Sequence, residues 1–136
     1  MKLIKRDKYL NQLINVICVP DIKIITGVRR AGKSKLLEAL KKYVQTNIKD
    51  SNIIHINYSL TKFEKLKEYH ALDEYVTKNY VKGKKNFLLI DEVQMCEGFE
   101  IAINSFHAEE KYDIYITGSN AFLLSSDLAT LFTGRT

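Results

Sequence analysis

Short apolar segments alternate with longer amphipathic segments along the chain. Four of the short segments have the length and the apolar, largely isoleucine- and leucine-rich composition of buried strands: Ile22–Thr26, Asn52–Asn57, Asn86–Asp91 and Asp113–Thr117. Every position from Phe87 to Ile90 is apolar, which is typical of a strand covered on both faces. The pattern therefore predicts four strands of one buried sheet.

Apolar residues recur at helical spacing in the segments that flank these strands. The expected helices are residues 7–18, Ser34–Val44, Lys62–Tyr80, Phe99–Phe106 and Ala121–Leu131. Alternating strands and helices predict an α/β fold, a parallel sheet with right-handed crossovers in a three-layer α-β-α arrangement. Ligands bind such sheets beyond the carboxyl ends of the strands, so the residues after each strand are the first candidates for a site.

The segment after the first strand is Gly27-Val28-Arg29-Arg30-Ala31-Gly32-Lys33-Ser34, which matches the P-loop pattern G-x-x-x-x-G-K-[ST] at every fixed position. Glycines let the backbone fold closely around phosphates, and successive backbone N–H groups form an anion-binding nest. We expect this segment and Lys35 to bind the phosphates of ATP, with Lys33 on the β- and γ-phosphates and the Ser34 hydroxyl on Mg²⁺. An ordinary glycine turn is disfavoured by the strand before the motif and the amphipathic helix after it.

Asp91 and Glu92 close the third apolar strand, as in a Walker B motif. An aspartate at a strand end beside a P-loop can hold Mg²⁺ through its water shell. The adjacent Glu92 can polarise the water that attacks the γ-phosphate. We therefore expect Asp91 to be a metal ligand and Glu92 to be the catalytic base. The alternative is an acidic pair that only caps a strand-to-helix turn.

The turn Thr117-Gly118-Ser119-Asn120 follows the fourth strand, on the sheet edge that also carries Asp91. An amide or hydroxyl there can hydrogen-bond the γ-phosphate or the attacking water, and Asn120 is our candidate for contact with the nucleotide. Ser119 or Asn120 can equally cap the next helix, and the two roles are compatible. Arg135 can reach a γ-phosphate or lie on the surface, and the sequence leaves both readings open.

The composition is that of an ordinary globular domain. The 136 residues are 46% hydrophobic and 27% charged, which excludes an extended disordered chain. No apolar run approaches the ~20 residues of a membrane-spanning helix, and the N-terminus lacks a signal-peptide pattern, so we expect a cytoplasmic protein without a membrane partner. The two cysteines, Cys18 and Cys96, and three scattered histidines predict neither disulfides nor a zinc site.

Several motifs together carry a resemblance to a known family. They are Arg6-Asp7-Lys8-Tyr9-Leu10, the P-loop with its Arg29-Arg30 pair, Leu89-Ile90-Asp91-Glu92-Val93-Gln94, Ile116-Thr117-Gly118-Ser119-Asn120 and Thr133-Gly134-Arg135. Through these motifs the chain resembles the AAA-type P-loop ATPases of bacteria and archaea. In that family the P-loop core precedes a winged-helix-like region and a C-terminal domain of uncertain role.

The resemblance implies that the Asp113–Thr117 strand lies between the P-loop strand and the Asp91 strand. It also implies Walker A roles for Lys33 and Ser34, Walker B roles for Asp91 and Glu92, and the sensor position for Ser119 or Asn120. Because family members continue beyond Gly134-Arg135, we expect residues 1–136 to be a single ATPase core from a longer protein, without its last strand and lid. A sheet edge left open beside the P-loop strand would favour self-association.

The expected function is Mg-ATP binding and hydrolysis coupled to attached domains or a macromolecular partner. Glu92 argues against a small-molecule kinase, and the run Asp91–Gln94 lacks the Asp-x-x-Gly of a GTP switch. An ATP-regulated nucleic-acid-binding module is the main alternative, because the net charge is +5. The lysines are dispersed, however, which favours a solvated surface over a nucleic-acid-binding stripe.

Overall fold

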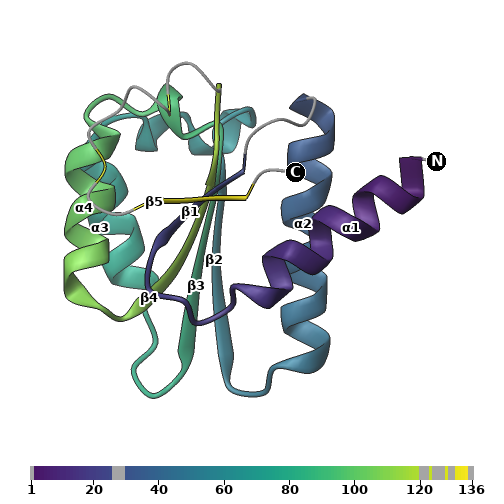
Figure 1. The fold of residues 1–136 in the computed structure, drawn as a ribbon. Helices are drawn as coiled ribbons and strands as arrows, with labels where there is room; N and C mark the ends of the chain where they lie inside the picture. Colours follow the sequence, from purple (N-terminus) through teal and green to yellow (C-terminus); the bar gives the residue numbers. More distant parts are fainter. Residues whose placement is uncertain (1, 26–29, 120–122, 124–127, 129–130, 135–136) are drawn as a thin grey trace.

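Five parallel strands form a single sheet at the centre of the fold (Figure 1). The structure, a computed structural model, describes residues 2–25, 30–119, 123, 128 and 131–134. The strands are β1 (Ile22–Ile25), β2 (Ser51–Asn57), β3 (Lys85–Asp91), β4 (Tyr112–Thr117) and β5 (Leu131–Gly134). Their order is β2-β3-β4-β1-β5, and every neighbouring pair is parallel. The carboxyl ends of all five strands therefore lie on the same side of the sheet, which is called the carboxyl edge below.

Helices cover both faces of the sheet, as Figure 1 shows. α1 (Lys2–Asn15) and α2 (Arg30–Asn47) lie on one face, and α3 (Tyr69–Asn79) and α4 (Phe99–Glu109) lie on the other. Two short 3₁₀ helices, η1 (Thr61–Leu66) and η2 (Val93–Met95), follow the ends of β2 and β3. The predicted three-layer α/β architecture is confirmed.

β3 shows why the sheet is so firmly held in the interior. Its last six residues are buried. Leu88 and Ile90 belong to the core that includes residues of α3 and α4, whereas Phe87 and Leu89 belong to the core that includes residues of α1 and α2. Successive side chains of a strand point to opposite faces, so an unbroken apolar run supplies both cores. This burial fixes the position of Asp91 at the end of β3.

The order of the strands confirms that β4 lies between β1 and β3. The expectation that the last strand would be missing was wrong. β5 pairs with β1 from Ile22↔Leu131 to Ile25↔Gly134 and covers the edge that we expected to be open. The helix predicted over Ala121–Leu131 includes Leu131, which instead begins β5. Four residues are too few for strand alternation to stand out. The rest of that predicted helix lies outside the described residues, except for positions 123 and 128.

The helix predicted over Lys62–Tyr80 is two helices, η1 and α3, with a break at Lys67–Glu68. At the break, the Glu68 carboxylate accepts hydrogen bonds from the N–H groups of His70 (3.0 Å) and Ala71 (3.3 Å) and caps α3. These N–H groups stabilise the carboxylate, with His70 contributing most, and lower the pKa of Glu68. The backbone of Lys67 and Tyr69 also pairs with Glu97. A tertiary contact thus interrupts a continuous helical pattern.

Candidate functional site

The polar residues that follow the central strands meet at the carboxyl edge of the sheet. The register of β3 and β4 pairs Ile90 with Ile116, so Asp91 and Thr117 are the next residues along the two strands. α2, which follows β1 in the chain, brings Ser34 to the same place. Ser34 and Thr117, which lie 57 and 26 positions from Asp91 in the sequence, thereby meet at its carboxylate.

Asp91 is the centre of this cluster and is 1% exposed. One carboxylate oxygen, Oδ2, accepts a hydrogen bond from the Ser34 hydroxyl, and the other, Oδ1, accepts one from the Thr117 hydroxyl. A buried carboxylate is costly unless such donors compensate for lost water. The two hydroxyl groups therefore hold Asp91 in place and join α2, β3 and β4 at a single side chain.

Glu92 adopts a left-handed backbone conformation, with φ 58°. Non-glycine residues occupy this region infrequently, and such residues often occur at functional sites. The Glu92 N–H donates to Thr117 Oγ1 (3.0 Å), and the Glu92 carboxylate accepts from Gln94 Nε2 (2.7 Å). Glu92 is 7% exposed, and the contact with Gln94 restricts where its carboxylate points.

Lys33 lies in the first turns of α2 and is 5% exposed. Its ammonium group donates to the Gly118 carbonyl oxygen at 2.6 Å. α2 begins at Arg30, four residues before the predicted start, so Lys33 lies in the first turn of the helix, next to N–H groups that have no partner within it. Such a helix start favours an anion through its N–H groups and its dipole.

The structure brings four of the predicted site residues together: Lys33, Ser34, Asp91 and Glu92. Gly32 lies beside them in α2, and Lys35 is exposed on the same helix. Arg30 and Ala31 also belong to α2, but only their backbone is described. The predicted residues Gly27, Val28, Arg29, Asn120 and Arg135 lie outside the described residues.

Three residues of the cluster were not among the predicted site residues: Thr117, Gly118 and Gln94. Thr117 had a detectable signal, because a hydroxyl residue that ends the strand beside Asp91 must lie near the carboxylate. The roles of Gly118 and Gln94 depend on how two turns approach each other. No spacing rule along the sequence captures that approach.

The oxygen atoms at Ser34 and Asp91 suit Mg²⁺, which prefers carboxylate, hydroxyl, water and phosphate oxygens. The described residues contain no group of three or more His, Cys, Asp and Glu side chains able to hold a metal ion. Mg²⁺ is usually bound by one or two carboxylates together with substrate phosphates and water, so Asp91 and Ser34 could supply the protein's share of the ligands. The donor set is therefore compatible with Mg²⁺ bound together with ATP.

A histidine lies on β2, near α2. His55 Nδ1 lies 3.7 Å from Glu38 Oε2, one helical turn beyond Ser34. Burial lowers the pKa of His55 below its usual 6.5, and nearby Glu38 only partly opposes this. The neutral form of the imidazole therefore predominates at pH 7.

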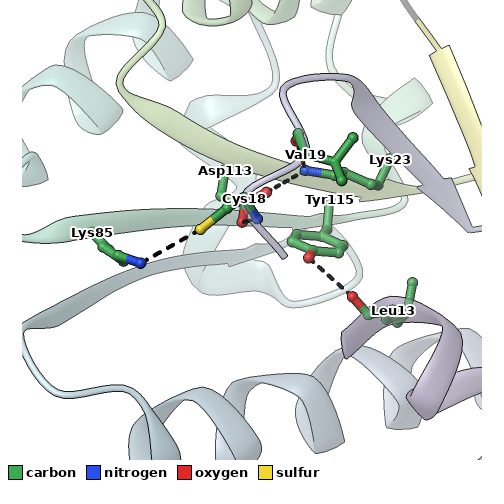
Figure 2. Close-up of polar contacts among 7 residues, drawn as sticks. All are labelled: Leu13, Cys18, Val19, Lys23, Lys85, Asp113 and Tyr115. Carbon is green, nitrogen blue, oxygen red and sulfur yellow. Dashed lines mark hydrogen bonds and ion pairs between the residues drawn. The ribbon is translucent and has the colours of Figure 1, made fainter. Parts of the chain in front are cut away.

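A second polar cluster lies at the opposite edge of the sheet (Figure 2). Lys23, which is 1% exposed, pairs with Asp113 at 2.5 Å and also donates to the Val19 carbonyl. Asp113 accepts a further hydrogen bond from the Cys18 N–H (2.9 Å). These contacts bind the segment before β1 to β4. They fix the start of the strand that leads to the P-loop, on the side away from Asp91.

Comparisons with known proteins agree with this architecture. The model of a protein family described as an AAA domain matches residues 19–136. An uncharacterized protein of Haemophilus influenzae is 38% identical over 135 residues, covering 98% of this chain and 34% of that protein. An uncharacterized protein of Methanocaldococcus jannaschii is 30% identical over 142 residues, covering 99% of this chain and 30% of that protein. The chain thus spans about a third of the length of these relatives.

Among solved structures, the fold matches a chain in the structure of Drosophila ORC bound to AT-rich DNA and Cdc6. The TM-score is 0.60 at 12% identity, and the match covers 97% of this chain and 55% of that chain. At this identity the likeness concerns the fold alone. Within the described part of the chain, the helices are too short or too polar to cross a bilayer.

Proposed function

Since the chain belongs to the AAA domain family, we propose that it binds and hydrolyses Mg-ATP at the carboxyl edge of its sheet. The observation that carries this proposal is the convergence of the Ser34 and Thr117 hydroxyls on buried Asp91. The convergence joins α2, which contains the end of the P-loop motif, to the strand that ends at Asp91. A carboxylate that only capped the end of a strand would not need a hydrogen bond from a serine 57 positions away in the sequence.

In this proposal each residue has a distinct task. The P-loop, Gly27–Ser34, surrounds the phosphates, and Lys33 exchanges the Gly118 carbonyl for phosphate oxygens. Ser34 and Asp91 hold Mg²⁺, which neutralises charge on the phosphates. Glu92 orients a water and accepts its proton as the water oxygen bonds to the γ-phosphorus and the bond to ADP breaks. Lys35 and Asn120 are further candidates for contact with the nucleotide.

We further propose that the nucleotide state acts on attached segments or on a macromolecular partner. The relatives are about three times as long as this chain, so they have further segments on which a nucleotide-dependent change could act. Nucleic acid is the alternative partner class, because the chain carries a net charge of +5. The structural neighbour was solved with AT-rich DNA. ATP turnover measured with and without DNA separates the two readings, since only a nucleic-acid-coupled enzyme changes its rate.

The binding site is tested by substituting Lys33. Mg-ATP at about 100 times its Kd should stabilise the wild-type protein by roughly 2.7 kcal/mol. In a domain of this size the melting temperature should then rise by about 4 °C or more. Lys33→Ala should abolish this shift, because the phosphates lose their principal cation. GTP should give a smaller shift, since no guanine-specific carboxylate was found in the sequence.

The matched control is Lys42→Ala, which removes an exposed lysine from the same helix. This variant should keep the full shift with Mg-ATP. If Lys33→Ala kept the shift as well, the P-loop segment would not be the nucleotide site.

A further inference from the structure

Gln94 lies in η2, two residues after Glu92, and its carboxamide reaches back to the Glu92 carboxylate. We propose that Gln94 is a positioning residue, which holds the Glu92 carboxylate in the orientation that activates water. The inference rests on the proposed function, because it assigns Gln94 to the same ATPase site. Gln94 would act through Glu92 and make no contact with the nucleotide itself.

The orientation of the carboxamide follows from its partner. Gln94 Nε2 lies 2.7 Å from Glu92 Oε1. A carboxylate oxygen only accepts hydrogen bonds, so the amide nitrogen must be the atom that faces it. A hydrogen bond from an amide to a charged carboxylate is stronger than one between neutral groups, and it is directional. The contact therefore restricts the rotation of a side chain whose backbone already has φ 58°.

The other end of the carboxamide argues against a role in stability. Gln94 Oε1 is buried and has no hydrogen-bond partner among the described residues. A buried acceptor without a donor is unfavourable, so such a group calls for an explanation. A side chain retained only for stability would gain by losing this oxygen. The contact with Glu92 is the feature that explains why an amide occupies the position.

Gly118 provides the space for this oxygen. A Cβ atom added at Gly118 would lie 2.4 Å from Gln94 Oε1 and 3.1 Å from Leu123 Cδ1. The carbonyl of the same glycine accepts the hydrogen bond from Lys33. The Gly118 turn therefore contacts both the lysine of the P-loop and the side chain that orients Glu92. Departure of Lys33 toward phosphates would release the turn against which Gln94 packs.

The test compares ATP turnover and Mg-ATP affinity in the full-length natural protein and in Gln94→Met, which keeps the side-chain volume but removes the donor. We expect kcat to fall by about 10- to 100-fold, the range expected when a catalytic group is misplaced. The Kd for Mg-ATP should change less than about twofold, since Lys33, Ser34 and Asp91 are intact. The control Met95→Ala changes an exposed neighbour in η2 and should leave kcat unaltered.

A double-mutant cycle separates positioning from a structural effect. In a Glu92→Ala background, Gln94→Met should cause no further loss in single-turnover rate, because the group it orients is gone. Gly118→Ala should lower kcat in the wild type by displacing the carboxamide, and combining it with Gln94→Ala should be no worse than Gln94→Ala alone. Gln94→Leu, which also lacks the donor, replaces Gln94→Met if the latter does not fold.

Two results would overturn the role of Gln94: a kcat that stays the same or rises in Gln94→Met, or an equal loss in the Glu92→Ala background. Failure of the proposed function looks different. In that case the wild-type protein itself would bind Mg-ATP without hydrolysing it, or would not bind it, and both proposals would fall together.

Discussion

At the scale of single residues, the site depends on one hydroxyl group, that of Thr117, which hydrogen-bonds to both Asp91 and Glu92. Thr117 is fully buried, donates to Asp91 Oδ1 and accepts from the Glu92 N–H at 3.0 Å. A hydroxyl group can do both, whereas an amide nitrogen or a methyl group cannot. Thr117 thus sets the spacing between the proposed metal ligand and the proposed base.

Removal of this hydroxyl should be costly. Thr117→Val keeps the shape but leaves the Asp91 carboxylate and the Glu92 N–H each without one partner. Because each of the two unsatisfied buried groups costs about 1–3 kcal/mol, we expect the free energy of unfolding to fall by about 2–6 kcal/mol in urea titrations. Thr117→Ser, which retains the hydroxyl, should lose only about 1 kcal/mol for the missing methyl group. Equal losses in the two variants would show that the hydrogen bonds contribute little.

A second prediction concerns the role of Asp91 as a ligand of Mg²⁺. Asp91→Asn removes the charge of the carboxylate and keeps its size. The affinity for ATP should therefore fall chiefly when Mg²⁺ is present, and little in EDTA, because only the metal-bound form uses the carboxylate. Titration of a fluorescent ATP analogue under both conditions measures the difference. The same loss with and without Mg²⁺ would place Asp91 outside the metal site.

At the scale of elements, the start of β1 depends on a buried ion pair. The ammonium group of Lys23 is balanced by Asp113, and burial of a charge without its partner is strongly unfavourable. Burial also raises the pKa of Tyr115, whose hydroxyl donates to the Leu13 carbonyl of α1 at 3.2 Å. The pair links β1 to β4, and the tyrosine links β4 to α1 (Figure 2).

Asp113→Ala should therefore destabilise the fold by about 3–5 kcal/mol, the range measured when one partner of a buried pair is removed. The control Glu74→Ala changes an exposed carboxylate on α3 and should stay within about 0.5 kcal/mol of the wild type. Chemical denaturation of the three proteins gives the comparison. A loss for Asp113→Ala no larger than for the control would mean that Lys23 finds water or another partner.

His55 on β2 should make stability depend on pH. Burial lowers the pKa of His55 below its usual 6.5. Between the lowered pKa and 6.5 the unfolded chain binds more protons than the folded chain, so stability rises with pH across this window. Acidification from about pH 7.5 to pH 5.5 should then lower the melting temperature, and His55→Gln should lose part of this dependence. An identical pH profile in the variant would exclude the contribution of His55.

At the scale of the whole molecule, most of the architecture could be predicted from the sequence. The strands β1 to β4 are apolar enough to be recognised from the sequence, and the parallel sheet follows from their alternation with helices. β5 was missed because its stability comes from pairing with β1 and leaves no pattern in four residues. The break before α3 was missed for a similar reason, since Glu68 and Glu97 meet only in the folded chain.

The residues of the candidate site likewise fall into two groups: those that sequence motifs predict and those that only the structure reveals. Lys33, Ser34, Asp91 and Glu92 belong to motifs whose spacing reflects their chemistry, and the structure brings them together. Gln94 and Gly118 could not be found from spacing, because their contact depends on the left-handed turn at Glu92 and on how closely two loops approach. Motifs therefore predict the groups that would touch the nucleotide, and the structure adds those that would orient them.

The most direct test of this account is phosphate release by the wild-type protein and by Glu92→Gln, with the Kd for Mg-ATP measured for both. Glu92→Gln keeps the size of the side chain and removes the proton acceptor. The account predicts an unchanged Kd and a rate lower by about 100-fold or more, because general-base catalysis typically contributes 10²–10⁴-fold. Hydrolysis by Glu92→Gln at the wild-type rate, or loss of binding together with hydrolysis, would contradict it.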